Sequence, residues 1–352
     1  MDLRNILLLL YGSSCLLSWL DITNIRPYIK YYIASILFLL FLCTGVMLFP
    51  FTPDYLMYST QYYDFARDDF SLPEPYDETI DYGFLTIFTL VKSLGGDSIA
   101  VYLCITLLVL CVYFFILKKY TSAFFTATFF LLSRQYELQN IIQIRQGLAC
   151  AVVLFSLQYV QSRNLKKFLL CVLIASLIHK TLVVAILIYP MSLIHWNTRS
   201  VFLVILGSVV LCFSPLTDFL IDSLVNVDVG TVKLMQYAAT SESADVKDSQ
   251  LIINIISLSI CAVLLLRFHA NKYANVFISM LLLGMIIASS FSNFSIFSNR
   301  LSLIFRLAIP FVPALVIEEC KGWSNKIIVM ILISFIGLLL ATRGYINYSE
   351  FY

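Results

Sequence analysis

The long, uninterrupted apolar runs of this chain constrain its fold more than any other feature. The sequence is 60% hydrophobic and 12% charged, whereas about a quarter of the residues in soluble domains are charged. A membrane-crossing helix needs roughly 20 apolar residues, so the length leaves room for about 12 spans. The runs are continuous and do not alternate, which favours helices over a barrel. We therefore expect an all-α polytopic membrane protein that forms a single integral membrane domain over residues 1–352.

The polar breaks between the apolar runs predict where each helix lies. The first run is followed by another span and by no small-residue cleavage site, so we expect a retained helix there. Residues 168–190 form either one span or two short helices that bend at His179 and Lys180. A helix over about residues 82–94 is expected to lie on the outer membrane surface, because its apolar residues follow helical spacing and a glycine pair ends it. The predicted spans are residues 5–20, 29–49, 98–117, 121–136, 141–160, 166–178, 180–194, 199–217, 251–268, 273–290, 301–318 and 326–343.

The positions of lysine and arginine predict the orientation. Cytoplasmic loops are enriched in these residues, and here they gather in five short loops, near positions 26–30, 118–119, 163–167, 267–272 and 321–326. The two longer loops, about 51–83 and 218–250, are then outward-facing, the second only if the chain turns at His179. Because an outward position for both long loops requires this turn, it favours two short helices over one span.

Ionised side chains at membrane depth cost at least a few kcal/mol, so each needs an explanation. Arg145 lies at the outer start of a predicted span, beside Gln146, and is either an interfacial arginine or a cation aimed at a lipid-linked phosphate. His179 is either a satisfied structural histidine or a site residue at the outward turn. Arg300 lies at the mouth of a late span. Arg306, six residues later, lies on the opposite side of an ideal helix and is either a site residue or a buried structural arginine.

Polar and charged groups converge on the predicted outer face. Asp54 and Tyr58 follow a span directly, at the level where Arg145, His179 and Arg300 also emerge. Interfacial tyrosines are commonly membrane anchors, but the convergence suits a substrate with an anionic lipid phosphate and a polyhydroxylated head. The net charge of +2 does not suggest a nucleic-acid partner. The nine cysteines form no CxxC pair and are expected to be small core residues, neither disulfides nor metal ligands.

Four segments stand in a fixed order along the chain: DYLMYSTQYY from Asp54, DYGF from Asp81, IRQGLACAVVLFSLQYVQSRNLKKFLLCVLIASLIHKT over residues 144–181, and SNRLSLIFRLAIPFVP from Ser298. Their order and spacing resemble the EpsG-type branch of the Wzy O-antigen polymerases, a family of polysaccharide repeat-unit polymerases. That family has an Asp-x-x-x-Tyr segment, an acidic-x-Gly-Phe segment, an Arg-Gln-x-x-Ala helix ending in His-x-Ser/Thr, and a late arginine helix. Asp81 stands where the family usually has glutamate, and neither arginine nor glycine immediately precedes Asp54.

The resemblance implies a glycosyltransferase-C-like membrane enzyme. Such an enzyme moves a growing glycan from its polyprenyl diphosphate carrier onto the next lipid-linked repeat unit, on the outer (periplasmic) face of a bacterial inner membrane. The product would be an O-antigen, capsule or exopolysaccharide, and a chain-length regulator and a flippase of the same pathway are expected partners. No metal or cofactor is required.

The resemblance also suggests roles for the candidate residues. As a hypothesis, Arg145 and Arg300 grip the diphosphate, and His179 or Asp54 orients or deprotonates the acceptor hydroxyl. Further candidates for substrate contact are Gln146, Tyr58, Asp81 and Arg306.

Three other functions remain open from the sequence. A ligase or single-sugar transferase would use the same donors without making a repeat ladder. A flippase or transporter of lipid-linked oligosaccharide would need charged groups through both halves of the membrane, whereas here they gather on one face, and no matching broken spans occur in the two halves. The last alternative is a scaffold of an export complex.

Overall fold

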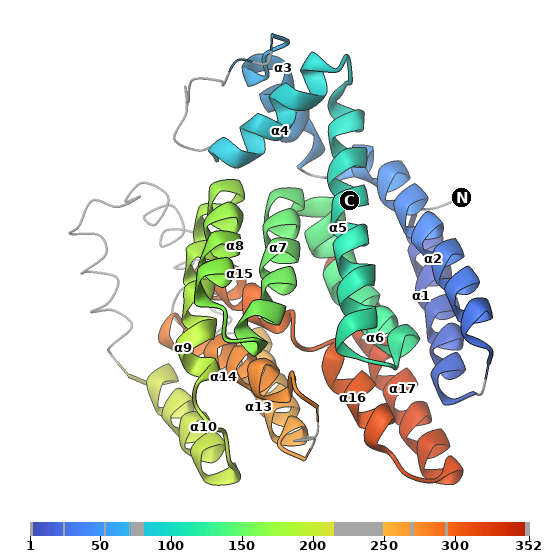
Figure 1. Cartoon of the computed structure of the whole chain (residues 1–352), viewed down its shortest axis with the longest axis vertical. Coiled ribbons are helices and arrows are strands. Elements are labelled where there is room, and N and C mark those ends of the chain that lie inside the picture. Colours follow the sequence, from blue (N-terminus) through green and yellow to red (C-terminus); the bar gives the residue numbers. More distant parts are fainter. Residues whose placement is uncertain are drawn as a thin grey trace. The chain divides into compact units, whose positions relative to one another are not determined.

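The protein is described by a computed structural model over residues 3–23, 25–52, 54–69, 71, 81–214, 249–267, 271–292 and 295–348. The described residues form helices and no strand, which confirms the predicted all-α class (Figure 1). The chain divides into two compact units. Unit 1 comprises Met1–Tyr159, Asn164–Val183 and Pro313–Tyr352, and unit 2 comprises Val160–Arg163 and Val184–Val312. The single integral membrane domain stays a prediction.

Unit 1 contains most of the long helices. In chain order its elements are α1 (Leu3–Ser18), η1 (Trp19–Ile22), α2 (Pro27–Leu48), η2 (Phe49–Phe51), α3 (Tyr55–Phe65), α4 (Tyr82–Ser93), α5 (Ser98–Tyr120), α6 (Phe124–Phe130), the π-helical η3 (Leu131–Ile142), α7 (Ile144–Gln161), α8 (Leu165–Ile178) and α17 (Trp323–Tyr348). Three elements have residues in both units: α7, whose last two residues belong to unit 2, η4 (Lys180–Leu187) and α16 (Phe311–Glu319).

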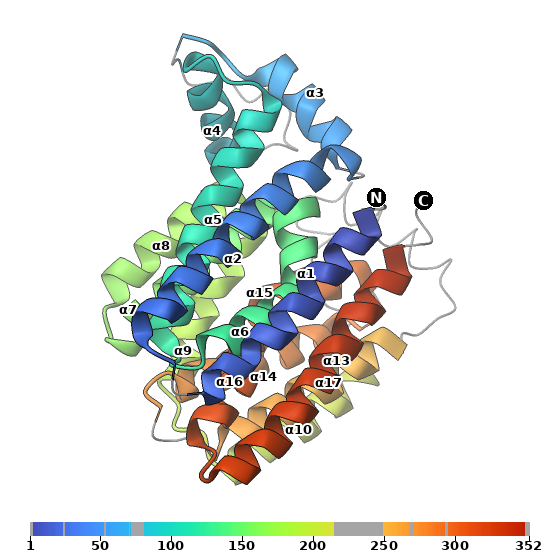
Figure 2. The same cartoon turned by 90° about the vertical axis from the view of Figure 1, so that its right-hand side faces the viewer.

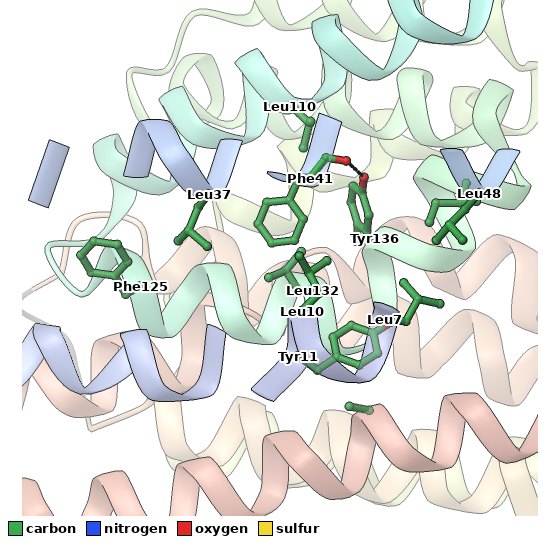
Figure 3. Packing of buried hydrophobic residues seen from close by; sticks show 12 residues of the cluster. Leu7, Leu10, Tyr11, Leu37, Phe41, Leu48, Leu110, Phe125, Leu132 and Tyr136 are labelled. Carbon is green, nitrogen blue, oxygen red and sulfur yellow. Dashed lines mark hydrogen bonds between the residues drawn. The ribbon is translucent and has the colours of Figure 1, made fainter. Parts of the chain in front are cut away.

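The core of unit 1 lies where α1, α2, α5, α6 and η3 meet. Phe41 of α2 and Tyr136 of η3 are fully buried, and the Tyr136 hydroxyl donates a hydrogen bond to the carbonyl oxygen of Phe41 (Figure 3). Leu10 and Tyr11 of α1 pack into the same cluster. Figure 2 shows α17 running beside α1, with which it is in contact. Segments from both ends of unit 1 therefore enclose one apolar core.

The sequence of α5 explains both its ends and its length. The Asp97 side chain caps the start by accepting a hydrogen bond from the Ala100 amide at 2.8 Å. Lys118 and Lys119 occupy the last turn, where positive charge complements the helix dipole. At 1.5 Å per residue, 23 residues extend about 34 Å, enough to cross a bilayer core of about 30 Å.

Unit 2 is built around α14 (Ala274–Ser290), whose side chains are buried along nearly its whole length. It packs against α9 (Ile188–Ser192), α10 (Thr198–Cys212), α13 (Ser249–Leu265) and α15 (Ser295–Arg306). Trp196 donates a hydrogen bond from Nε1 to the Ser279 hydroxyl at 2.8 Å, which fixes the connection between α9 and α10 onto α14. The unit is therefore a helical bundle with an apolar central helix.

Within the described residues, five helical stretches are long and apolar enough to cross a membrane, or six if one bent pair forms a single span. The five are Asn5–Ile22, Pro27–Phe51, Ser98–Tyr120, Ser298–Glu319 and Trp323–Ala341, and the bent pair is Gln135–Ile142 with Ile144–Gln161. Five further apolar helices have 10–17 residues, which corresponds to about 15–26 Å and is shorter than the hydrocarbon core. Each of the twelve predicted spans overlaps a helix. Many of these helices are too short to cross the hydrocarbon core, so their lengths do not confirm a count of twelve.

The outward faces of the long helices fit a lipid environment. Leu39 and Met47 of α2 are 56% and 61% exposed, and Leu108 of α5 is 52% exposed. Soluble monomeric proteins rarely expose many large apolar side chains side by side. Cys43, Cys104 and Cys111 also lie exposed on these helices, so the expectation that the cysteines are core residues is wrong for them.

Three local predictions can be compared with the structure. The predicted helix over residues 82–94 is α4. The expected break at His179 is present: α8 ends at Ile178, and His179 is extended at φ −153° and ψ 110°. The predicted outer loop over about residues 51–83 is not a plain loop, because it contains α3. The tyrosines and polar residues of α3 show no clear helical spacing in the sequence. The segment 218–250 lies almost entirely outside the described residues.

Candidate active site

A buried carboxylate, that of Asp81, is the centre of the candidate site in unit 1. Its side chain is 7% exposed, and its Oδ2 atom lies 3.4 Å from Nδ1 of His179 and 4.0 Å from Nη1 of Arg145. The start of α4, the start of α7 and the end of α8 thus each supply one member. The structure brings together three residues that are up to 98 positions apart in the sequence.

Local structure directs the Asp81 side chain toward this cluster. Asp81 is the N-cap residue of α4, and its carbonyl oxygen accepts hydrogen bonds from the amides of Phe84 and Leu85 at 3.1 Å. An N-cap aspartate usually also accepts a backbone N–H with its carboxylate, but no such bond forms here. The carboxylate faces Arg145 and His179 instead, and such a departure from a local rule is expected at functional sites.

Gly83 allows α4 to approach the end of α8. A Cβ atom at this position would lie 2.8 Å from the carbonyl carbon and oxygen of Leu177 and 3.0 Å from the amide nitrogen of Ile178. These are backbone atoms, which cannot rotate away. The absence of a side chain at Gly83 therefore lets Asp81, two residues earlier, reach His179, which follows Ile178 directly.

Arg145 lies just after a sharp bend in the chain. The axes of η3 and α7 differ by 120°, and Gln143 between them has a non-helical conformation at φ −89° and ψ 59°. On the η3 side, the Tyr113 hydroxyl donates a hydrogen bond to Oε1 of Gln139 at 3.1 Å. π-Helical segments are frequent at functional sites. The bend places Arg145 in the first turn of α7 and not in the middle of a continuous span.

Two aromatic rings flank the guanidinium group of Arg145. Its Cζ atom lies 5.5 Å from the ring centre of Tyr58 and 5.7 Å from that of Phe84. Contacts of this kind contribute about 0.5–2 kcal/mol, depending on how far the charge is removed from water. The rings restrict the position of the guanidinium while Asp81 balances its charge.

Polar side chains surround the start of α7. Gln139, Asn140 and Gln146 are all buried. Among the described residues, the side-chain oxygen and nitrogen of Asn140 and the Oε1 atom of Gln143 have no hydrogen-bond partner. Buried polar atoms normally require a partner, and ordered water or a polar ligand can supply it. These buried polar atoms therefore suit contact with bound water or with part of a hydrophilic substrate.

The geometry at His179 assigns different roles to its two nitrogens. An ionised carboxylate can only accept hydrogen bonds, so Nδ1 carries the hydrogen when it bonds Asp81. In the neutral ring, Nε2 is then without a hydrogen and can accept a proton. The His179 side chain is 25% exposed, so it is partly accessible from outside the cluster.

Tyr58 and Asp54 lie on the same side of the cluster. Tyr58 is 5% exposed, and its amide donates a hydrogen bond to the carbonyl oxygen of Asp54 at 3.0 Å. Burial raises the pKa of the Tyr58 phenol above 10.0, and the adjacent Arg145 only partly offsets this shift. Tyr58 is therefore protonated at neutral pH and can donate a hydrogen bond but cannot act as a base. Asp54 is partly exposed, one helical turn before it.

Arg300 and Arg306 belong to α15 of unit 2. Arg300 is exposed and Arg306 is 7% exposed, which agrees with the prediction that they lie on opposite sides of the helix. The Arg306 guanidinium donates from Nη2 to the carbonyl oxygen of Asn299 at 2.8 Å. That contact favours the structural interpretation of Arg306. A shared site of Arg300 with Arg145 stays a prediction.

The sequence did not assign roles to Gly83 and Phe84, although both stand in the DYGF segment. Their roles depend on contacts with Leu177 and Arg145, far away in the sequence. Asp81, a candidate for substrate contact, lies against two other candidates, Arg145 and His179; its contact with substrate stays a prediction. Within the described ranges, no group of three or more His, Cys, Asp or Glu side chains is arranged to hold a metal ion.

These features define a class: a helical membrane protein with an Asp–His–Arg cluster built around a buried aspartate, where its helices begin and end. The family model named EpsG family matches residues 4–352, and the chain therefore belongs to the EpsG family. Membership points to a polysaccharide polymerase-type role. No curated protein and no solved structure matches the chain.

Proposed function

We propose that this protein polymerises lipid-linked oligosaccharide repeat units. It transfers the growing glycan from a polyprenyl diphosphate carrier to a hydroxyl of the next lipid-linked unit. The observation that carries the proposal is the buried Asp81 carboxylate, which holds Arg145 and His179 together in a chain of the EpsG family. This cluster combines a cation for a leaving diphosphate with a base for an acceptor hydroxyl.

The reaction breaks one bond and forms another at the same carbon. The bond between the anomeric carbon and the diphosphate oxygen breaks, and a bond from that carbon to the acceptor oxygen forms. Negative charge develops on the leaving diphosphate, and a guanidinium can stabilise it with two parallel hydrogen bonds. Arg145 supplies this group, and its flanking rings hold it in place before substrate arrives.

His179 takes the proton of the acceptor hydroxyl. Asp81 fixes the hydrogen on Nδ1, which leaves Nε2 as the base. Asp81 is a positioning residue in this scheme, since it acts through His179 and Arg145. Asp54 and Tyr58, at the edge of the cluster, hold sugar hydroxyls, and Gln146 belongs to the polar surroundings of Arg145.

Arg300 provides a second cation for the diphosphate. Its exposed position on α15 supports this role, whereas the bond of Arg306 to its own helix supports a structural one.

The proposed setting is the bacterial inner membrane, with the cluster on the outer face. The short loops rich in lysine and arginine support this orientation. We propose about twelve spans in a glycosyltransferase-C-like arrangement, in which the shorter apolar helices cross as broken or tilted segments. A chain-length regulator and a flippase are the proposed partners.

A reconstituted assay tests the proposal. Purified protein in liposomes is given labelled lipid-linked repeat units, and the products are separated by length on a gel. We expect a ladder from the wild type and from Lys166→Gln, a charge-removing control in the first turn of α8, at the opposite end of that helix from His179. We expect strongly reduced polymer from Arg145→Gln and His179→Gln.

Other products would point to other functions. A single added unit with no ladder indicates a single-sugar transferase or ligase. Transport of the labelled lipid into the liposome without polymer indicates a flippase. Full ladders from both site variants at equal protein level would refute the assignment of Arg145 and His179.

A further inference from the structure

A groove of about 820 Å³ opens at the other end of unit 1, between the start of α2 and the end of α5. Its walls also include the end of η1 and the start of α6. None of Asp81, Arg145 or His179 lines it. Its lining is charged at Lys30 and Lys118 and apolar at the phenylalanines. A lipid has the matching arrangement, with a charged headgroup and an apolar acyl chain.

Two lysines stand at the mouth of the groove. Lys30 is in the first turn of α2, and Lys118 is in the last turn of the neighbouring α5. The Nζ atom of Lys118 lies 4.3 Å from the centre of the Tyr31 ring, which keeps its ammonium at this mouth. The first turn of α2 contains no acidic residue and follows Arg26. The positive end of the helix dipole adds to these charges, so an anion is stabilised here.

Aromatic side chains form the deeper wall. Phe38 of α2 and Phe114 of α5 are in edge-to-face contact with ring centres 5.3 Å apart, and Phe115 and Phe124 also line the groove. Nine residues separate Lys30 from Leu39, which also lines it, so the apolar wall extends about 14 Å from the mouth at 1.5 Å per residue. That depth accommodates a large part of an acyl chain.

Two carboxylates nearby are held by backbone amides. Asp21 lines the groove within electrostatic range of Lys30, and its Oδ2 atom accepts a hydrogen bond from the Thr126 amide at 2.6 Å. Glu318 accepts hydrogen bonds from the Ala123 amide at 3.2 Å and from the Thr121 hydroxyl at 2.5 Å. Both acids therefore cap the start of α6, while the two lysines remain at the mouth.

We propose that this groove binds an anionic phospholipid. The phosphate lies between Lys30 and Lys118, and one acyl chain follows the phenylalanine wall. The concentration of lysine and arginine at this end predicts that it faces the cytoplasmic leaflet, where anionic lipids attract basic groups. This site is separate from the Asp81 cluster, and its test does not depend on the polymerase proposal.

Native mass spectrometry of the full chain in detergent, titrated with phosphatidylglycerol or phosphatidylcholine, tests the site. We expect the wild type to retain phosphatidylglycerol in preference to phosphatidylcholine. The double variant Lys30→Gln/Lys118→Gln should bind phosphatidylglycerol about 30-fold more weakly, equivalent to about 1 kcal/mol per lysine. The matched control Lys321→Gln/Lys326→Gln, just before α17 and in its first turn, removes two charges that do not line the groove and should bind as the wild type does.

Charge-conserving variants separate a lost site from lost folding. Lys30→Arg/Lys118→Arg should retain binding, because both positive charges remain. Equal weakening in the control pair, or equal binding of the two lipids by the wild type, overturns the proposal. Binding of a polyprenyl phosphate without binding of phosphatidylglycerol also overturns it, since the groove would then take the glycan carrier and not a phospholipid.

Discussion

Replacing Gly83 with alanine tests whether the close approach of α4 to α8 positions the cluster. The new methyl group would lie 2.8 Å from two backbone atoms of Leu177, whereas ordinary van der Waals contact begins near 3.4 Å. The helices must therefore separate by about 0.6 Å, the difference between these distances. The distance from Asp81 to His179, 3.4 Å, would then grow to about 4.0 Å, too long for a hydrogen bond.

The free energy of unfolding should change less than the activity. Overpacking of this kind costs about 1–3 kcal/mol, but alanine in a helix is more favourable than glycine by about 1 kcal/mol. The net destabilisation is thus at most about 2 kcal/mol. A displacement approaching 1 Å at a catalytic group can cost about 100-fold in rate. We expect polymer synthesis to fall by about 10- to 100-fold while the protein remains folded.

The assay compares initial rates of polymer formation at equal protein level, with thermal unfolding in detergent measured beside it. Gly12→Ala is the matched control, because Gly12 is also helical and a Cβ there meets no atom within 4 Å. It should be neutral or slightly stabilising and fully active. A Gly83→Ala protein that polymerises at the wild-type rate would show that contact with α8 does not set the position of Asp81.

Three further changes have defined outcomes. Arg145→Lys keeps the positive charge but loses the paired hydrogen bonds, so its polymerisation rate should lie between those of the wild type and Arg145→Gln. Equal rates for the wild type and the lysine variant would contradict bidentate binding of the diphosphate. Tyr58→Phe should leave the pH–rate profile unchanged between pH 6 and 9, because the raised pKa keeps the phenol protonated throughout that range. If the variant lost the rise or the fall of the rate with pH that the wild type shows, Tyr58 would be a titrating catalytic group. Gly337→Ala pushes a methyl group into the buried ring of Phe129. After the gain in helix propensity of about 1 kcal/mol, it should lower the thermal midpoint by the equivalent of at most about 2 kcal/mol, and an unchanged midpoint would mean that α17 shifts to accommodate the methyl group.

Much of the fold was predictable because hydrophobicity is a local property. Apolar runs of the right length indicate helices wherever they occur, and each predicted span overlaps a helix. The break at His179 was also visible, since two polar residues follow a long apolar stretch. The sequence was less informative about α3, whose tyrosines and polar residues give no clear period. The bend before Arg145 was not predicted either, because it depends on contacts such as that between Tyr113 and Gln139.

The sequence by itself determined the all-helical membrane class, the family resemblance and the list of ionisable candidates. Each followed from residue types at short spacing, which need no knowledge of the fold. The tertiary structure decided which candidates meet. It joined Asp81, Arg145 and His179 through the close packing at Gly83, and assigned Arg306 a contact within its own helix. The physical reason is that contacts between distant segments depend on backbone paths and packing distances, which no local pattern specifies.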